Sequence, residues 1–279
     1  MKIGRFMQDG RAMDGVVQGE TVQRVGPWHD AADPWQPFRL PALAPAELAA
    51  LPALQTLPLA ALQCLPPIDL ASKVLCVGLN YRAHADEVGR AQASQPSLFL
   101  RAWDTLQGHG APLLRPRASE QYDFEGEIAV VIGRPGRAIA RAQAMDHVFG
   151  YTCLMDGSLR DFQKHSVTAG KNFWRSGAIG PWILTADEVP DPRALHLRTR
   201  LNGQLVQQAG ADALIHDIAA LIAYVSQWTP LRAGDVIATG TPAGVGLSRT
   251  PPLWLVPGDV LEVEVEPVGT LRNTIAQET

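Results

Sequence analysis

From Lys73 to the C-terminus, apolar residues fall in short runs separated by glycine and proline, and this spacing constrains the fold most. The runs are VLCVGL, LFLRAW, IAVVIG, GAIGPWIL, LRTRLNG, DVIATGT and VLEVEVE. Their length and their β-branched residues are typical of strands. Helical spacing is clear only around Ala140–Asp146, at residues 158–164 and over Asp217–Gln227. We therefore predict an α+β, mainly β fold rather than a doubly wound one.

The first 70 residues differ in composition from the rest. KIGRF and GVVQGETVQRV, with the glycines near them, predict short strands or hairpins over residues 1–30. Residues 31–70 are rich in Pro, Ala and Leu, which favours one short helix near Pro45–Ala50 in an otherwise extended connection. We place a boundary near Pro66–Ser72. This predicts a small N-terminal β-rich domain with its linker at 1–70 and a catalytic domain at 71–279.

Composition narrows the class of protein. The 279 residues carry a net charge of -4 and show no Lys/Arg stripe, so a nucleic-acid partner is not expected. The three cysteines form no CxxC pair, which argues against a disulfide framework or a cysteine-only zinc site. The N-terminus lacks a signal-peptide apolar stretch, and no run approaches a membrane span. We expect a cytoplasmic protein with no membrane partner.

An acidic cluster precedes one of the predicted strands. Asp123-Phe-Glu125-Gly-Glu127 leads directly into the apolar run IAVVI. In a single strand, Glu125 and Glu127 project from the same face, where two carboxylates repel unless a cation or proton lies between them. A solvated strand face is the alternative for an isolated pair. The abrupt change to an apolar strand and a third acid, Asp156, instead favour a site for Mg²⁺ or Mn²⁺.

A histidine and a glutamate follow the predicted strand VLCVGL. If Arg82–Val88 is helical, His84 and Glu87 face the same way. A carboxylate beside an imidazole fixes its tautomer and suits a general base near neutral pH. A surface histidine with a solvated glutamate is the alternative. In the same segment, Tyr81 and Arg82 are predicted to contact substrate.

Three further residues are candidate anchors. Lys171, between a glycine and an aromatic region, is predicted to hold a substrate carboxylate or support the metal site; an exposed loop lysine is the alternative. Arg101 ends an apolar strand, where a solvated strand end is favoured over substrate binding. Thr241 lies in the loop TGTPAGVG, whose hydroxyl and backbone N–H groups suit an anionic oxygen, unless the loop is a bare glycine turn. No P-loop, dinucleotide fingerprint, GxSxG elbow or HExxH motif is present.

The ordered motifs resemble a known family. KVLCVGLNYRAHADEVG, DFEGEIAVVIG, GYTCLMDGSLRDFQ, GKNF…GPWILTADEV, GDVIATGTPAGVG and GTLRN are similar, in this order, to the fumarylacetoacetate hydrolase C-terminal domain. Within that superfamily they resemble the acylpyruvate hydrolase and 2-hydroxyhepta-2,4-diene-1,7-dioate isomerase branch. The resemblance implies a mixed β-roll with a small N-terminal β domain, usually a homodimer, and a role in aromatic-compound catabolism.

The resemblance also implies roles for individual residues. It makes Glu125, Glu127 and Asp156 ligands of one Mg²⁺ or Mn²⁺ ion. It makes His84 and Glu87 a water-activating dyad, and it places Lys171 and Thr241 at the metal and substrate site.

Two departures concern the substrate. Asp-Gly-Ser stands at 156–158 where many relatives have Asp-Val-Ser. The stretch from Gln163 to Thr168 varies between subfamilies, so Gln163 is a predicted substrate contact and His165 a hypothesis for a subgroup-specific one.

The expected reaction is hydrolysis of a C–C bond in a small acylpyruvate-type diketo acid. Decarboxylation, isomerisation and hydration of 2-oxo acids use the same scaffold in relatives, and the His84–Glu87 dyad favours hydrolysis among them. A non-catalytic binding protein that keeps the fold is the alternative from another class. It predicts missing ligands, whereas all three carboxylates and the dyad are present.

Overall fold

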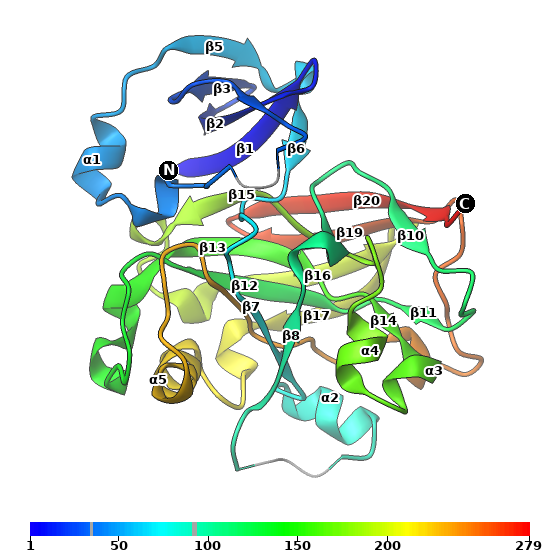
Figure 1. The fold of residues 1–279 in the computed structure, drawn as a ribbon. Coiled ribbons are helices and arrows are strands. Elements are labelled where there is room, and N and C mark those ends of the chain that lie inside the picture. The colour runs from blue at the N-terminus through cyan, green and yellow to red at the C-terminus, as the bar shows by residue number, and fades with distance from the viewer. Residues whose placement is uncertain (34–35, 91–93) are drawn as a thin grey trace.

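The computed structural model describes residues 1–33, 36–90 and 94–279 (Figure 1). Part of the predicted linker, residues 34–35, lies outside these ranges. The described chain is mostly strand, arranged in mixed sheets, which confirms the predicted mainly β, α+β class. No helix within the described ranges is both long enough and apolar enough to span a bilayer.

A large mixed sheet forms the centre of the molecule. Its strand order is β5-β3-β2-β1-β15-β13-β12-β18-β7-β8, with β4, β6 and β9 paired beside it. Strands β1 to β6 come from the N-terminal part of the chain, between Lys2 and Leu65. The strands from the predicted catalytic domain are β7 (Val74–Gly78), β8 (Ser97–Arg101), β9 (Leu106–Gln107), β12 (Gly126–Ile132), β13 (Val148–Met155), β15 (Gly177–Thr185) and β18 (Val236–Ala238). Most pairs are antiparallel, but β18 pairs with β7 and β15 with β9 in parallel, so the sheet is mixed.

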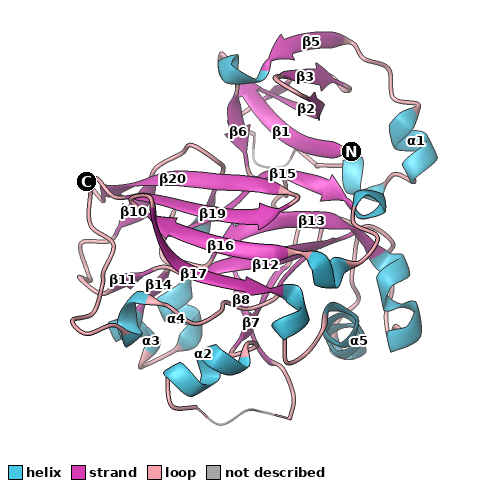
Figure 2. Ribbon diagram, turned by 180° about the vertical axis from the view of Figure 1, so that it is seen from behind, coloured by secondary structure: helices cyan, strands magenta, loops and turns pink. Residues whose placement is uncertain are grey.

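A second sheet of five strands packs against the first (Figure 2). Its order is β10-β20-β19-β16-β17, with bounds β10 (Leu113–Arg115), β20 (Gly269–Gln277), β19 (Val260–Glu266), β16 (His196–Leu201) and β17 (Gln204–Gly210). A short pair joins β11 (Tyr122–Asp123) to β14 (Ser158–Leu159). Helices α2 (Arg82–Glu87), α3 (Arg160–Gln163) and α4 (Val167–Lys171) gather on the side away from the N-terminus, and α5 (Ile218–Trp228) lies apart from them (Figure 1).

Strand β12 shows why this sequence folds as a sheet. All seven of its residues are buried, because β13 and β18 pair with its two edges and side chains cover both faces. Ile128, Val130 and Ile132 join the core shared with the second sheet, whereas Ala129 and Val131 join a core on the other face. A continuous apolar run of β-branched residues suits a strand that is buried on both sides. The strand that carries the acidic cluster is therefore held rigidly.

The N-terminal strands extend the large sheet. They are β1 (Lys2–Gln8), β2 (Arg11–Gln18), β3 (Thr21–Arg24), β4 (His29–Asp30), β5 (Gln55–Pro58) and β6 (Gln63–Leu65), and the short helix α1 covers Pro45–Ala49. Strand β1 pairs with β15, and these strands enclose a small core of their own around Phe6, Met13 and Val22. The division of the chain at residue 70 stays a prediction.

The structure differs from the sequence-based expectations in several places. Strands β5 and β6 pair with β3 and β1, so part of the expected extended connection belongs to the sheet. Strand β13 was not expected, although it places Asp156. The helix expected around Ala140–Asp146 is a 3₁₀ helix over Arg141–His147, and no side chain caps its first turn.

Asp14 on β2 gives a test of folding electrostatics. Burial raises the pKa of Asp14 to about 6, against the opposing charge of Arg5 and with help from Asp69. The proton is thus bound more tightly in the folded state, and the ionised form costs stability as pH rises from about 4 to 6. The unfolding free energy of Asp14→Asn minus that of wild type should increase by on the order of 2–3 kcal/mol when the pH is raised from 4 to 7.

Urea unfolding at the two pH values measures this difference. Glu20→Gln, in the exposed turn between β2 and β3, is the control and should show no such gain. Equal effects of Asp14→Asn at both pH values would contradict the burial argument.

Candidate metal centre and catalytic dyad

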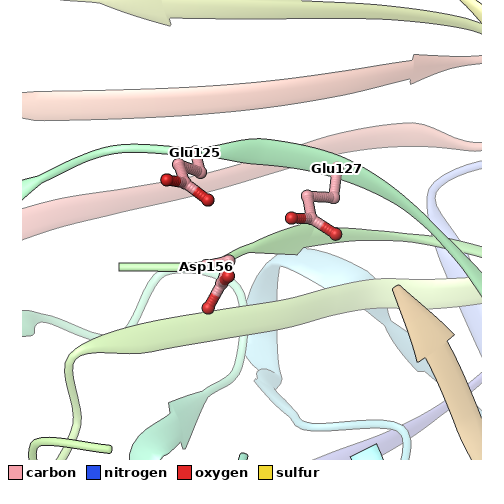
Figure 3. Close-up of side chains that lie close together, drawn as sticks. All are labelled: Glu125, Glu127 and Asp156. Atoms are coloured by element: carbon pink, nitrogen blue, oxygen red, sulfur yellow. The ribbon is translucent and has the colours of Figure 1, made fainter. Parts of the chain in front are cut away.

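Two neighbouring strands bring the three acids together. Strands β12 and β13 are antiparallel with Gly126 opposite Met155, and the Asp156 N–H donates to the Glu125 carbonyl at 2.8 Å. Glu125 therefore lies just before β12, Glu127 within it, and Asp156 just after β13. All three are buried, and one carboxylate oxygen from each lies within 4.8 Å of the others. Figure 3 shows the three side chains pointing toward a common region.

Gly126 is required where it stands between the two glutamates. A Cβ there would come within 2.1 Å of the Thr199 hydroxyl on β16. Its N–H donates to the Gln207 side chain at 3.0 Å, and its carbonyl accepts from the Thr241 hydroxyl at 2.9 Å. The Gly126 backbone is thus held between the second sheet and the glycine-rich loop, which fixes the directions of Glu125 and Glu127.

Buried cations surround the acids. The Lys171 Nζ lies 2.6 Å from one oxygen of Glu125 and 2.6 Å from one of Asp156. The second oxygen of Glu125 lies 2.7 Å from Arg160, and that of Asp156 lies 2.6 Å from Arg101. These distances are typical of charge-assisted hydrogen bonds. Glu125 and Asp156 are therefore fixed on both oxygens.

The three acids have different electrostatic environments. Burial opposes ionisation of Glu125, but Lys171 and Arg160 outweigh it and lower the pKa of Glu125 to about 2. Burial, with the negative charges of Asp156 and Glu125, raises the pKa of Glu127 well above its usual range. For Lys171, the carboxylates of Asp156 and Glu125 outweigh burial and raise its pKa.

Glu127 is the acid that lacks a counter-charge. No cationic side chain lies within ion-pair distance of it in the described part of the chain, and its one hydrogen bond comes from the Gly240 N–H at 2.9 Å. A buried carboxylate without a cation is costly. A hard divalent ion among three carboxylate oxygens would supply the missing positive charge. The donor set thus fits Mg²⁺ or Mn²⁺.

The predicted dyad forms on α2. The His84 Nδ1 lies 3.2 Å from one Glu87 carboxylate oxygen, and both residues face the same way, as their spacing predicted. The His84 side chain is 6% exposed, so the imidazole is buried, whereas Glu87, at 20% for its side chain, is partly open to solvent at the end of the helix. Glu87 also accepts from the Gly244 N–H at 2.9 Å, in the same glycine-rich loop whose Gly240 N–H donates to Glu127 at 2.9 Å. The dyad therefore lies beside the acid cluster.

The remaining candidate substrate contacts lie in different surroundings. Tyr81 is buried at the start of α2 with a hydroxyl that has no partner among the described residues, and Arg82 beside it is exposed. Both line a cavity of about 600 Å³.

The other two candidate contacts, Gln163 and Thr241, are hydrogen-bonded within the protein. Gln163 accepts a hydrogen bond from Arg160 at 2.8 Å. The Thr241 hydroxyl donates to Gly126 and accepts from Gln207 at 2.8 Å. Substrate contact by these residues stays a prediction.

The structure excludes an exposed position for two candidate residues, which the sequence favoured for Arg101 and left as the alternative for Lys171. Arg101 is not a solvated strand end: its guanidinium is fully buried and also donates to the Gly157 carbonyl at 3.0 Å. Lys171 is not an exposed loop lysine, because it ends α4 with its side chain only 2% exposed. The Arg101 charge is covered by Asp156 and Gly157, 55 and 56 positions later in the chain. The Lys171 charge is covered by Glu125 and Asp156, 46 and 15 positions earlier.

Sequence reasoning missed Arg160 and assigned no role to Asp123. The Arg160 Nε donates to Asp123 at 2.8 Å while its other nitrogen reaches Glu125. Arg160 therefore links two acids of the DFEGE cluster and neutralises part of their charge. The sequence feature that could have identified Arg160 is its position four residues after Asp156, within the helix predicted at residues 158–164.

Comparisons with known proteins identify the family. The family described as fumarylacetoacetate (FAA) hydrolase C-terminal matches residues 73–276. Oxaloacetate tautomerase YisK of Bacillus subtilis is 40% identical over 75% of this chain and 71% of its own. Human mitochondrial oxaloacetate tautomerase FAHD2A is 37% identical over 75% and 68%, respectively.

Solved structures share the fold over their whole length. Maleylpyruvate hydrolase from Sphingobium sp. SYK-6, in complex with manganese(II) and pyruvate, superposes with a TM-score of 0.82 at 33% identity, covering 100% of both chains. The 2-hydroxyhepta-2,4-diene-1,7-dioate isomerase from Mycobacterium marinum has a TM-score of 0.80 at 33% identity, covering 100% of this chain and 99% of its own. The expected resemblance is confirmed: this chain belongs to the fumarylacetoacetate hydrolase C-terminal family.

Proposed function

We propose that this protein is a divalent-metal-dependent hydrolase that cleaves a C–C bond in a small acylpyruvate-type 1,3-diketo acid. The observation that carries the proposal is the His84–Glu87 pair beside the buried Glu125, Glu127 and Asp156. The relatives support the class of substrate, since they are named for hydrolysis, isomerisation or tautomerisation of small organic acids.

Glu125, Glu127 and Asp156 would hold the cation. When bound there, Mg²⁺ or Mn²⁺ supplies Lewis acidity toward the 2-oxo-carboxylate end of the substrate. Lys171 is already fixed between two of the acids and adds positive charge where negative charge develops. Arg101 and Arg160 contact carboxylates, so we assign them a positioning role. This replaces the predicted substrate contact of Arg101, whose side chain is fully covered.

His84 performs the proton transfers in this scheme. Glu87 accepts a hydrogen bond from Nδ1–H, which leaves Nε2 free to take a proton from water. The resulting hydroxide adds to the acyl carbonyl. The bond between that carbon and the methylene then breaks, its electron pair leaves as the enolate of pyruvate, and the imidazolium returns the proton to the methylene carbon. One water is consumed, and a carboxylic acid and pyruvate are formed.

Keto–enol tautomerisation of a 2-oxo acid is the second candidate. It is favoured by the curated relatives, among which oxaloacetate tautomerases from a bacterium and from vertebrates are 36–40% identical to this chain. The same base would move a proton between carbon and oxygen without breaking a C–C bond.

Product identification separates the two reactions. The purified protein with Mg²⁺ or Mn²⁺ is incubated with a panel of acylpyruvates and with oxaloacetate, and the products are followed by mass spectrometry and enol absorbance. Hydrolysis gives equimolar pyruvate and carboxylic acid from an acylpyruvate. Loss of the enol signal from oxaloacetate without any mass change, and no acylpyruvate cleavage, would replace hydrolysis with tautomerisation.

His84→Ala is expected to lower kcat by about 10²–10⁴-fold, the usual contribution of a positioned general base. Metal affinity should stay within about threefold, because His84 is not among the three acids. Steady-state kinetics and metal titration measure the two effects, and His29→Ala, at a histidine on β4 in the N-terminal strands, is the control. Full activity of His84→Ala would remove the base from the scheme.

A further inference from the structure

The turn Gly244–Ser248 contacts both halves of the candidate site. It begins within the glycine-rich loop. Gly244 and Ser248, at the two ends of the turn, bond Glu87 of the dyad. The N–H groups between them bond Asp123 of the acidic cluster. We propose that Ser248 is a positioning residue that holds the Glu87 carboxylate against His84. The inference rests on the proposed function of the dyad and adds a residue that sequence reasoning did not consider.

The two oxygens of Glu87 have separate partners. One faces the His84 Nδ1 at 3.2 Å. The other accepts from the Ser248 hydroxyl at 2.6 Å and from the Gly244 N–H at 2.9 Å. In the described residues Ser248 is the only side chain besides His84 that bonds this carboxylate. One oxygen is thereby anchored and the other is directed at the imidazole.

The short contact identifies the acceptor of the Ser248 hydroxyl proton. The Val245 carbonyl is also near, at 2.9 Å, but one hydroxyl donates a single proton. A separation of 2.6 Å is typical of a hydroxyl bonded to a carboxylate, and such bonds are roughly twice as strong as neutral ones. The proton therefore goes to Glu87.

The middle of the turn is hydrogen-bonded to the acidic cluster. Asp123 accepts from the Gly246 N–H at 2.7 Å and the Leu247 N–H at 2.9 Å. Asp123 is buried and is itself bonded to Arg160, whose guanidinium reaches Glu125. One ion pair and several hydrogen bonds thus link a candidate metal ligand through the turn to the dyad.

The turn has little freedom to move. Gly244 has φ +106°, and a Cβ there would lie 2.1 Å from the Val206 carbonyl on β17. A Cβ on Gly246 would lie 1.9 Å from the Leu253 carbonyl. Arg249 bonds the carbonyls of Val206 and Gly244 at 2.9 and 3.0 Å. The backbone that carries the Ser248 hydroxyl is therefore held in one conformation by its packing.

Helix α2 needs such support. It is only six residues long, no side chain caps its N-terminus, and Glu87 is its last residue. A glutamate at the end of a short helix has several side-chain rotamers available, and ordering it costs free energy. Ser248 and Gly244 select the rotamer in which Glu87 fixes the His84 tautomer with the proton on Nδ1.

Kinetics of Ser248→Ala test the proposal. Loss of a residue that supports a catalytic group commonly costs about 10–100-fold, so kcat should fall by about tenfold, with KM and metal affinity unchanged. Ser248→Thr keeps the hydroxyl and should recover most of the rate. In a Glu87→Ala background, Ser248→Ala should cause no further loss, because the hydroxyl has no carboxylate left to hold. Equal losses in both backgrounds would overturn the positioning role.

Ser119→Ala is the matched control. The Ser119 hydroxyl donates to Asp161 at 2.6 Å, the same length of bond to a carboxylate that contacts neither the dyad nor the three acids. Its kcat should stay within about twofold of wild type.

Hydrogen exchange separates this proposal from the proposed function. Amides of α2 should exchange faster in Ser248→Ala than in wild type, and Ser119→Ala should leave them unchanged. If wild type converts none of the substrates, the proposed function fails, and the exchange of α2 alone decides whether Ser248 holds this helix. Unchanged α2 exchange in Ser248→Ala would overturn the inference in either case.

Discussion

Replacing Lys171 with methionine is expected to lower the unfolding free energy of the metal-free protein by about 3–5 kcal/mol. The Lys171 ammonium is almost fully buried and lies 2.6 Å from both Glu125 and Asp156. Methionine fills similar volume but leaves the two carboxylates with one cationic partner each. Urea unfolding in EDTA measures the loss. Lys164→Met, at an exposed lysine nearby, should change stability by less than about 0.5 kcal/mol.

Added Mn²⁺ should recover part of this loss. A divalent ion between the three acids compensates the negative charge that Lys171 no longer neutralises, and binding to the folded state raises stability by mass action. An equal loss for Lys171→Met with and without metal would mean that the lysine and the ion do not act on the same carboxylates.

Glu127→Gln is expected to have opposite effects on stability and on activity. Burial and the neighbouring carboxylates raise the pKa of Glu127 well above its usual range, so its ionised form costs stability as pH rises above about 4.5. Glutamine lacks that cost, and the metal-free variant should be at least as stable as wild type at pH 7. Its activity should nevertheless fall by about 10³-fold, because one of three metal ligands is lost.

Thermal unfolding with EDTA and with Mn²⁺ measures this contrast alongside kcat/KM. The stabilisation of wild type by metal should disappear in Glu127→Gln. Glu120→Gln, at an exposed position upstream of the acidic cluster, should behave as wild type in both assays. A metal-stabilised, fully active Glu127→Gln protein would contradict the assignment of this residue as a ligand.

Local sequence was sufficient where one segment determines its own structure. The apolar run after Glu127 predicted β12, and the spacing of His84 and Glu87 predicted their contact on one face of α2. The three acids were predicted to meet because their residue types suit a hard cation, and the structure brings their oxygens within 4.8 Å.

Local sequence failed where surroundings come from distant segments. The sequence around Arg101 favours a solvated strand end. In the structure its guanidinium is covered by Asp156, Gly157 and Ser176, which lie more than 50 positions later in the chain. The hydrogen bond between Ser248 and Glu87 joins residues 161 positions apart, and no property of the sequence around either residue indicates it.

The most direct test of the central claim is a crystal structure of the protein grown with Mn²⁺, with anomalous diffraction used to locate the ion. We predict one strong anomalous peak that is bonded by a carboxylate oxygen from each of Glu125, Glu127 and Asp156, and its absence in crystals of Glu127→Gln. A peak at other residues, or no peak at millimolar Mn²⁺ with the three carboxylates still in place, would contradict the account.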